Sequence, residues 1–141
     1  MKKIFFLFFA MPFFTAAQNK LLVEGVSPGL YLTHKVAPKE NYYSIGRIYN
    51  VSPKDIAPFN KLQLEKGLSL GQAIKIPLNS SNFFQSGNAA DDETFVPVYY
   101  KVKDKEGLYR VAKNNNDLPL ETLKQWNKIT GDAVKNGVQL D

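Results

Sequence analysis

The chain has 141 residues, a formal net charge of +5 and no cysteine. Without cysteine it can form no disulfide, carry no lipid on a cysteine, and use no thiol for metal or redox chemistry. The lysines stand singly among acidic residues instead of forming one basic patch. That spacing is typical of a solvated surface and argues against nucleic acid as a partner.

The N-terminus has the pattern of a secretory signal peptide in residues 1–17. Two lysines precede an apolar run over residues 4–14, and small residues follow up to Ala17. This run of 11 residues is well short of the ~20 that a membrane-spanning helix needs. We therefore expect cleavage after Ala17, no transmembrane segment in the mature chain, and export to the periplasm, the cell wall or the medium. Loss of the two lysines lowers the net charge from +5 to +3.

A strand and a helix open the first folded segment. Residues 31–36 alternate apolar and polar side chains, as a half-buried strand does, and Pro38 ends the pattern. The spacing of the next apolar residues predicts a helix over 41–49, with Asn41 able to cap its start and Asn50 suited to a closing left-handed turn. The residues expected to face inward from this helix are Tyr42, Ile45, Ile48 and Tyr49.

A second helix and a second strand complete this segment. Ser52 is a capping residue directly before Pro53, and proline is favoured at the first helical position. Pro58 should keep this helix short or kink it. Residues 73–77 alternate again and predict a strand that pairs antiparallel with the first, with both helices on one face. The residues expected to face inward from the second helix are Ile56 and Phe59.

The same order returns 66 positions later, where Val102 matches Val36 and Glu106 matches Glu40. The second copy predicts a strand over 99–102, helices over 108–113 and 120–127, and a final strand over 137–140 that stops in mid-pattern. Pro119 replaces the capping serine, so we expect this copy to be less stable or differently packed. Further replacements are Asn114 and Asn115 for Ile48 and Tyr49, and Leu123 and Trp126 for Ile56 and Phe59.

These patterns predict an α+β fold of two tandem βααβ modules, each a two-stranded antiparallel sheet with two helices on one face. The first module is expected over 28–78 and the second, incomplete at its C-terminal end, over 96–141. Residues 79–95 are rich in Ser, Asn and Gly and predict a flexible linker. Two linked modules would gain affinity for a polymer through effective concentration.

The first copy resembles the lysin motif, or LysM, a small carbohydrate-binding module of proteins that act at bacterial cell walls. The resemblance covers most of residues 34–77, and its most specific part is Gly71-Gln72-Ala73-Ile74-Lys75-Ile76-Pro77. The second copy matches with Tyr100-Lys101-Val102 and Leu123-Lys124-Gln125-Trp126-Asn127. The usual Gly-Asp pair of the family is Lys39-Glu40 in one copy and Lys105-Glu106 in the other.

The resemblance implies that two loops of each module line a shallow groove for glycans that contain N-acetylglucosamine. A lysine in place of the usual loop glycine would crowd the sugar or add a polar contact. Carried over by position, the first groove would use Pro38, Lys39, Glu40, Asn41 and Tyr42 with Asn60, Lys61 and Leu62. The second would use Asp104, Lys105, Glu106, Gly107 and Leu108 with Asn127, Lys128 and Ile129.

The sequence brings no catalytic set together. The single histidine, His34, falls on the exposed phase of its strand, so neither a triad nor a zinc site can be assembled. Glycoside hydrolysis needs two carboxylates in one cleft, whereas Glu40 and Glu106 belong to separate modules. We therefore expect no catalysis, cofactor or metal within this chain. Tyr42 and Tyr43 have two interpretations, as core residues or as rings that stack on a glycan.

The sequence thus predicts non-catalytic binding of peptidoglycan, or of related chitin-like chains, in the cell envelope. Two alternatives stay open. The chain would be the targeting segment of a larger cell-wall hydrolase, whether peptidase, amidase or glycosidase. Otherwise it would be a protein-interaction scaffold whose modules have lost sugar binding.

Overall fold

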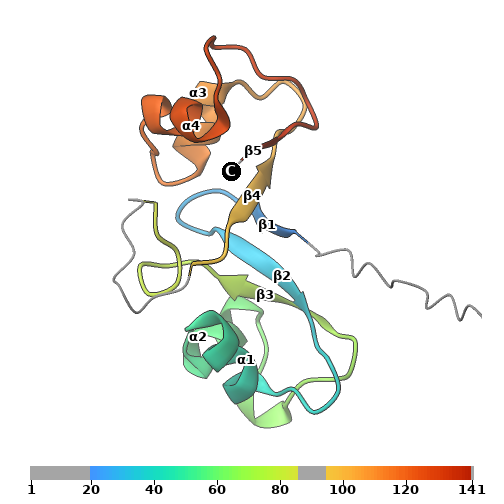
Figure 1. The fold of residues 1–141 in the computed structure, drawn as a ribbon. Helices are drawn as coiled ribbons and strands as arrows, with labels where there is room; N and C mark the ends of the chain where they lie inside the picture. The colour runs from blue at the N-terminus through green and yellow to red at the C-terminus, as the bar shows by residue number, and fades with distance from the viewer. Residues whose placement is uncertain (1–19, 86–94, 141) are drawn as a thin grey trace, which may run out of the picture.

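The computed structural model describes residues 20–85 and 95–140 (Figure 1). The predicted signal peptide, the middle of the predicted linker and Asp141 lie outside these residues. Among the described helices, none is long and apolar enough to cross a membrane. Two helix pairs pack on a sheet that runs between them, so the molecule has one pair near each end (Figure 1).

The first module has the predicted order of elements. Strands β2 (Tyr31–Lys35) and β3 (Ala73–Pro77) pair antiparallel, with Leu32 opposite Ile76 and His34 opposite Ile74. Helices α1 (Tyr42–Tyr49) and α2 (Pro53–Phe59) pack on one side of this pair, and a short 3-10 turn spans Leu64–Lys66.

Helix α1 begins and ends as predicted, and α2 begins at the predicted Pro53 and is short, with Pro58 inside its last turn. The Asn41 side chain accepts hydrogen bonds from the backbone N–H groups of Tyr43 and Ser44, and the Ser44 hydroxyl accepts one from the Asn41 N–H. These reciprocal bonds satisfy donors that an uncapped helix leaves open. Asn50 takes the left-handed conformation that ends α1, with φ of 51°. Ser52 caps α2 by accepting from Lys54 N–H.

The second module repeats this order without the side-chain caps. Its elements are β4 (Val98–Lys101), α3 (Leu108–Asn114), α4 (Leu120–Asn127) and β5 (Gln139–Leu140). Neither Gly107 nor Pro119, at the starts of α3 and α4, provides a side-chain cap. The two tandem βααβ modules of the α+β prediction are confirmed.

Two inward-facing residues were assigned wrongly from the sequence. Ile48 is 61% exposed, because on the short helix α1 the buried stripe is carried by Tyr42 and Ile45. Trp126 is 38% exposed, while Leu123 fills the inner position of α4. Phe59 and Tyr49 are only half-buried.

Strand β1 (Leu21–Glu24) has no counterpart in the predicted elements, and it joins the two modules. It pairs antiparallel with β2 and parallel with β4, so the strand order is β3-β2-β1-β4-β5. Val23 lies opposite both Leu32 and Tyr100. The two small sheets therefore become one sheet of five strands.

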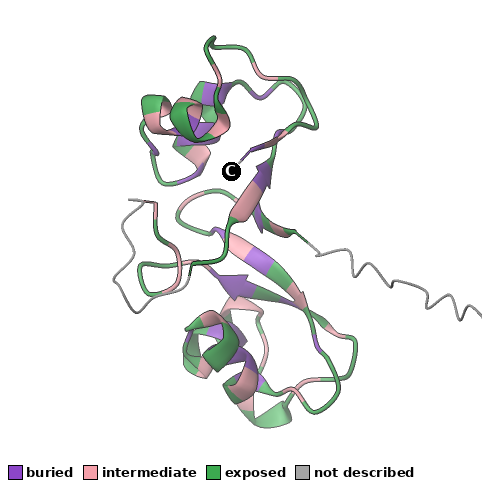
Figure 2. Cartoon of the chain, in the orientation of Figure 1, coloured by how far each residue is buried: buried purple, intermediate pink, exposed green. Residues whose placement is uncertain are grey.

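Buried residues occur in both modules and in β1 (Figure 2), and their side chains form one cluster. Residues 79–85 also lie against the folded part, since Asn50 Nδ2 donates to Ser81 O at 2.7 Å and Gln85 Nε2 donates to Asn115 O at 3.0 Å. Representative members of the cluster are Val23, Leu32, Ile56, Ile76, Tyr100, Val111, Leu123 and Leu140.

Candidate functional site

The loop between β2 and α1 holds a lysine in the left-handed backbone region. Lys39 has φ of 67°, and Lys105, at the matching place in the second module, has φ of 60°. A residue other than glycine is disfavoured there by about 1–2 kcal/mol, because its Cβ crowds the following carbonyl oxygen. The two copies therefore hold the same costly loop conformation. In each copy this lysine occupies the position of the usual glycine of the LysM pattern.

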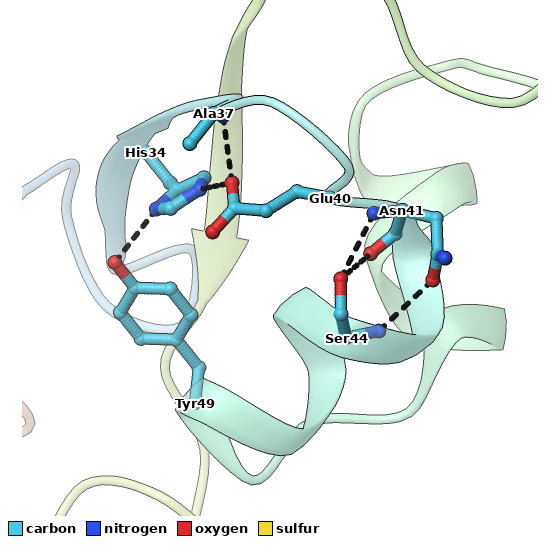
Figure 3. Close-up of polar contacts among 6 residues, drawn as sticks. All are labelled: His34, Ala37, Glu40, Asn41, Ser44 and Tyr49. Atoms are coloured by element: carbon cyan, nitrogen blue, oxygen red, sulfur yellow. Dashed lines mark hydrogen bonds and ion pairs between the residues drawn. The ribbon is translucent and has the colours of Figure 1, made fainter.

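Glu40 follows this lysine and turns its carboxylate back into the module (Figure 3). Its Oε2 accepts from Ala37 N–H at 2.7 Å and lies 2.7 Å from His34 Nε2, which donates to the ionised carboxylate. The other ring nitrogen of His34 lies 2.9 Å from the Tyr49 hydroxyl. The hydrogen bond from Ala37, and next the one from His34, lower the pKa of Glu40. The carboxylate thus ties the loop to β2 and, through His34, to α1.

The prediction that His34 falls on the exposed phase of its strand is wrong. Its side chain is only 14% exposed, and its ring packs edge-on against Tyr49 with centroids 5.4 Å apart. Successive side chains of a strand point to opposite faces, so His34 shares the face of Leu32 and Val36, which are both buried, and not that of the exposed Thr33 and Lys35. His34 belongs to the support of the loop.

In the second module, Glu106 also ties its loop to the preceding strand, but with different partners. It is buried and accepts from the Tyr100 hydroxyl at 2.9 Å, from Lys103 N–H at 3.0 Å and from Asn114 Nδ2 at 2.9 Å. Burial, and then the bond to Glu106, raise the pKa of Tyr100 to about 12. Tyr100 matches His34 in the repeat, so the same carboxylate is held from the strand by a phenol in one copy and an imidazole in the other.

The next two positions of the predicted groove start the first helix of each module. Asn41 is the cap of α1, and Gly107 occupies the same place before α3. Tyr42 and Leu108 are buried, so their side chains belong to the core and only their backbone can meet a ligand. Tyr43, in contrast, is 64% exposed.

The second predicted loop follows the second helix of each module. The Asn60 amide is fully engaged: Nδ2 donates to Lys75 O and Oδ1 accepts from Lys75 N–H, both at 2.7 Å, which pins the end of α2 to β3. The Asn127 amide donates to Leu123 O at 2.9 Å. Leu62 and Ile129 are partly buried against the core.

A lysine in the left-handed region recurs in this loop also. Lys61 has φ of 56° and Lys128 has φ of 54°. Like Lys39 and Lys105, these lysines are exposed, and their ammonium groups make no hydrogen bond or ion pair with the described residues. Each candidate site therefore presents two cationic side chains, exposed backbone and, in the first module, the ring of Pro38.

The two glutamates that the sequence singled out are turned into their own modules and bonded there. Within residues 20–85 and 95–140, no group of three or more His, Asp or Glu side chains is placed to hold a metal ion. Each site therefore presents two loops with a left-handed lysine in each and two exposed ammonium groups beside them.

An apolar cleft lies between the two modules, away from these loops. Its volume is about 790 Å³, and none of the predicted groove residues lines it. Sequence analysis could not reveal it, because its walls come from both copies and from β1. Lining residues include Val23, Tyr49, Tyr100, Val111 and Trp126.

Comparison with known proteins gives a family match at both copies. The family model described as LysM domain matches residues 34–77 and 100–140. No curated protein matches the chain significantly. Among solved structures, the crystal structure of the Bacillus cereus spore cortex-lytic enzyme SleL aligns at 22% sequence identity with a TM-score of 0.36. The alignment covers 78% of this chain and 22% of that one, so this chain spans under a quarter of that protein.

Proposed function

Since this chain belongs to the LysM domain family, we propose that it binds peptidoglycan in the cell envelope through N-acetylglucosamine units and catalyses no reaction on it. The ligand contacts would come from the two loops of each module, which include Lys39 and Lys61 in the first and Lys105 and Lys128 in the second. An exported protein with this activity would reside in the periplasm or at the cell wall.

One observation carries the proposal. The lysine-glutamate loop has the same backbone conformation in both modules, with φ of 67° and 60° at the lysine, although the side chains that support it differ. Keeping a strained backbone with two different sets of supports indicates that the shape of the loop matters for function, since strain of this kind collects at ligand-binding sites.

The chemistry of the loop suits the proposed ligand. Acetamido sugars are neutral and carry hydroxyl groups, an amide and one methyl group, so backbone N–H and C=O groups with a few apolar walls can recognise them. The exposed lysines add charge that neutral chitin does not need. Peptidoglycan has carboxylates on its lactyl groups and stem peptides, which such lysines can pair with. This difference favours peptidoglycan over chitin.

Retention of residues 18–141 on insoluble peptidoglycan, with and without soluble chitin oligomers, tests the proposal. We expect retention that the oligomers reduce. The double variant Lys39→Gly/Lys105→Gly keeps the left-handed loop and should still be retained. Lys39→Ile/Lys105→Ile should be released, because a β-branched residue is strongly disfavoured at positive φ and forces the loop to change.

The matched control is Lys54→Ile, an exposed lysine on α2 outside both loops. It should be retained like the parent, and circular dichroism should show that every variant is folded. No retention of the parent, or retention that chitin oligomers do not affect, would contradict glycan binding and favour the protein-interaction scaffold.

A further inference from the structure

The direction of the strands places the two candidate sites at opposite ends of the molecule. Strand β1 is antiparallel to β2 and parallel to β4, so β2 and β4 run in opposite directions (Figure 1). The sheet twist between strands two places apart, about 40–50°, does not reverse this. The loop that follows β2 therefore leaves one end of the sheet, and the loop that follows β4 leaves the other.

Within each module, the segment that enters the last strand meets the start of the lysine-glutamate loop. Gly71 N–H donates to Val36 O at 2.8 Å, and Gly137 N–H donates to Val102 O at 2.9 Å. The second loop of the first module stays with its own module, because the Asn60 amide bonds to Lys75 of β3. Each lysine-glutamate loop therefore lies at its own end of the sheet.

The separation follows from the strand register. Val23 lies opposite Leu32 and Tyr100, which puts these residues on one row across the sheet. From that row, Val36 lies four residues along one direction and Val102 lies two residues along the other. At a rise of about 3.3 Å per residue, the two loops begin about 20 Å apart along the sheet and then extend further outward.

Contacts outside the sheet also hold the two modules in this arrangement. Ser27, in the segment between β1 and β2, donates its N–H to Asn114 O at 2.9 Å and its hydroxyl to Asn116 Oδ1 at 2.6 Å. Gln85 donates to Asn115 O at 3.0 Å. Hydrogen bonds from two segments outside the second module, at Ser27 and Gln85, therefore reach the end of α3 and hold the modules in this arrangement.

We propose that one molecule binds two separate glycan chains, one at each end, and so bridges them. This inference rests on the proposed function and gives it a second consequence. Two modules on a freely moving tether would grip neighbouring stretches of one chain. Two sites fixed at opposite ends instead favour adjacent chains of a wall. The left-handed backbone at Lys39 and Lys105, and at Lys61 and Lys128, gives both ends of the molecule the same candidate loops.

A sandwich assay tests bridging. The chain of residues 18–141 is loaded on beads that carry a short chitin oligomer at low density, washed, and then offered the same oligomer in fluorescent form. The immobilised oligomers are too far apart for one molecule to reach two of them, so its second site stays open, and we expect capture well above the background of the beads alone. Lys39→Ile and Lys105→Ile, each taken singly, should remain on the beads through the intact site and lose the capture.

Lys39→Gly and Lys105→Gly are the matched controls and should capture the oligomer like the parent. Retention of the parent without capture would overturn bridging and leave glycan binding standing. Capture by the single isoleucine variants would also overturn it, because two sites would then come from two paired molecules. No retention at all would be the failure of the proposed function itself.

Discussion

At the scale of single residues, the loops that bear the candidate sites are supported by side chains that face inward. Glu40 and Glu106 both accept hydrogen bonds from the backbone three residues earlier and from the preceding strand. The sequence predicted these glutamates as ligand contacts, and that role stays a prediction for their backbone. Their carboxylates hold the loop in shape, and the lysines before them remain free to face a ligand.

Ionisation of Glu40 should make the first module sensitive to acid. Its bonds to Ala37 and His34 lower its pKa below the ordinary 4.5, so the ionised form stabilises the fold above pH 4.5 and that stabilisation is lost as the pH falls through the lowered pKa. Urea unfolding at a series of pH values should show that, below pH 4.5, the free energy of unfolding falls less steeply in Glu40→Gln than in the parent. Glu65→Gln, on the exposed 3-10 turn, is the control. Equal slopes in the parent and Glu40→Gln would contradict this role.

Tyr42→Phe should stabilise the protein. The Tyr42 hydroxyl is buried with no hydrogen-bond partner among the described residues, and an unsatisfied buried hydroxyl is costly. We expect a gain of about 1 kcal/mol in the free energy of unfolding, measured with urea. Tyr43→Phe is the matched control, because the neighbouring ring is 64% exposed and should give almost no change. A loss of stability in Tyr42→Phe would mean that the hydroxyl is satisfied in solution.

At the scale of elements, the two copies differ most at the helix ends. Asn41 and Ser52 cap the helices of the first module, whereas Gly107 and Pro119 leave those of the second uncapped by side chains. These ends were predictable because capping depends on residues within one turn. The residues that face inward from the helices were harder to predict. Ile48 and Trp126 fit a helical spacing, but the helices are short and only one narrow stripe of each meets the sheet.

Removing a cap from the first module and adding one to the second should change the free energy of unfolding in opposite directions. Asn41→Ala should cost about 1 kcal/mol, because it removes the acceptor for two backbone N–H groups. Gly107→Asn should gain a few tenths of a kcal/mol, since the backbone there is already extended and a Cβ meets nothing within 4 Å. Chemical denaturation measures both. A loss of stability in Gly107→Asn would show that α3 begins differently.

At the scale of the whole molecule, β1 decides how the modules act together. It is the central strand, and its residue Val23 lies between Leu32 of β2 and Tyr100 of β4, so β1 links these two strands. The buried cluster is continuous through it. Both copies should therefore unfold together, although the family matches at 34–77 and 100–140 leave β1 outside.

Val23→Pro should separate the two modules in unfolding. Proline removes a backbone donor and is tolerated poorly in a central strand. Trp126 is the single tryptophan, so its fluorescence follows the second module, while far-UV circular dichroism follows both. The two melting curves should coincide in the parent and diverge in Val23→Pro. Leu22→Ala, in the same strand but partly exposed, should keep them coincident. Coincident curves in Val23→Pro would contradict a joining role.

The sequence by itself determined the repeat, the strands and helices of each copy, their caps and the LysM family. Each of these depends on residue patterns within a short window. Only the tertiary structure decided that β1 joins the copies, since four residues without clear alternation carry no strand signal and their partners are distant in sequence. It also decided the burial of His34, the inward turn of Glu40 and Glu106, and the opposite directions of the two sites. The burial of His34 and the turn of the two glutamates depend on the groups that pack against them within each module. The opposite directions of the two sites depend on the pairing of β1 with β2 and β4, which no local pattern shows.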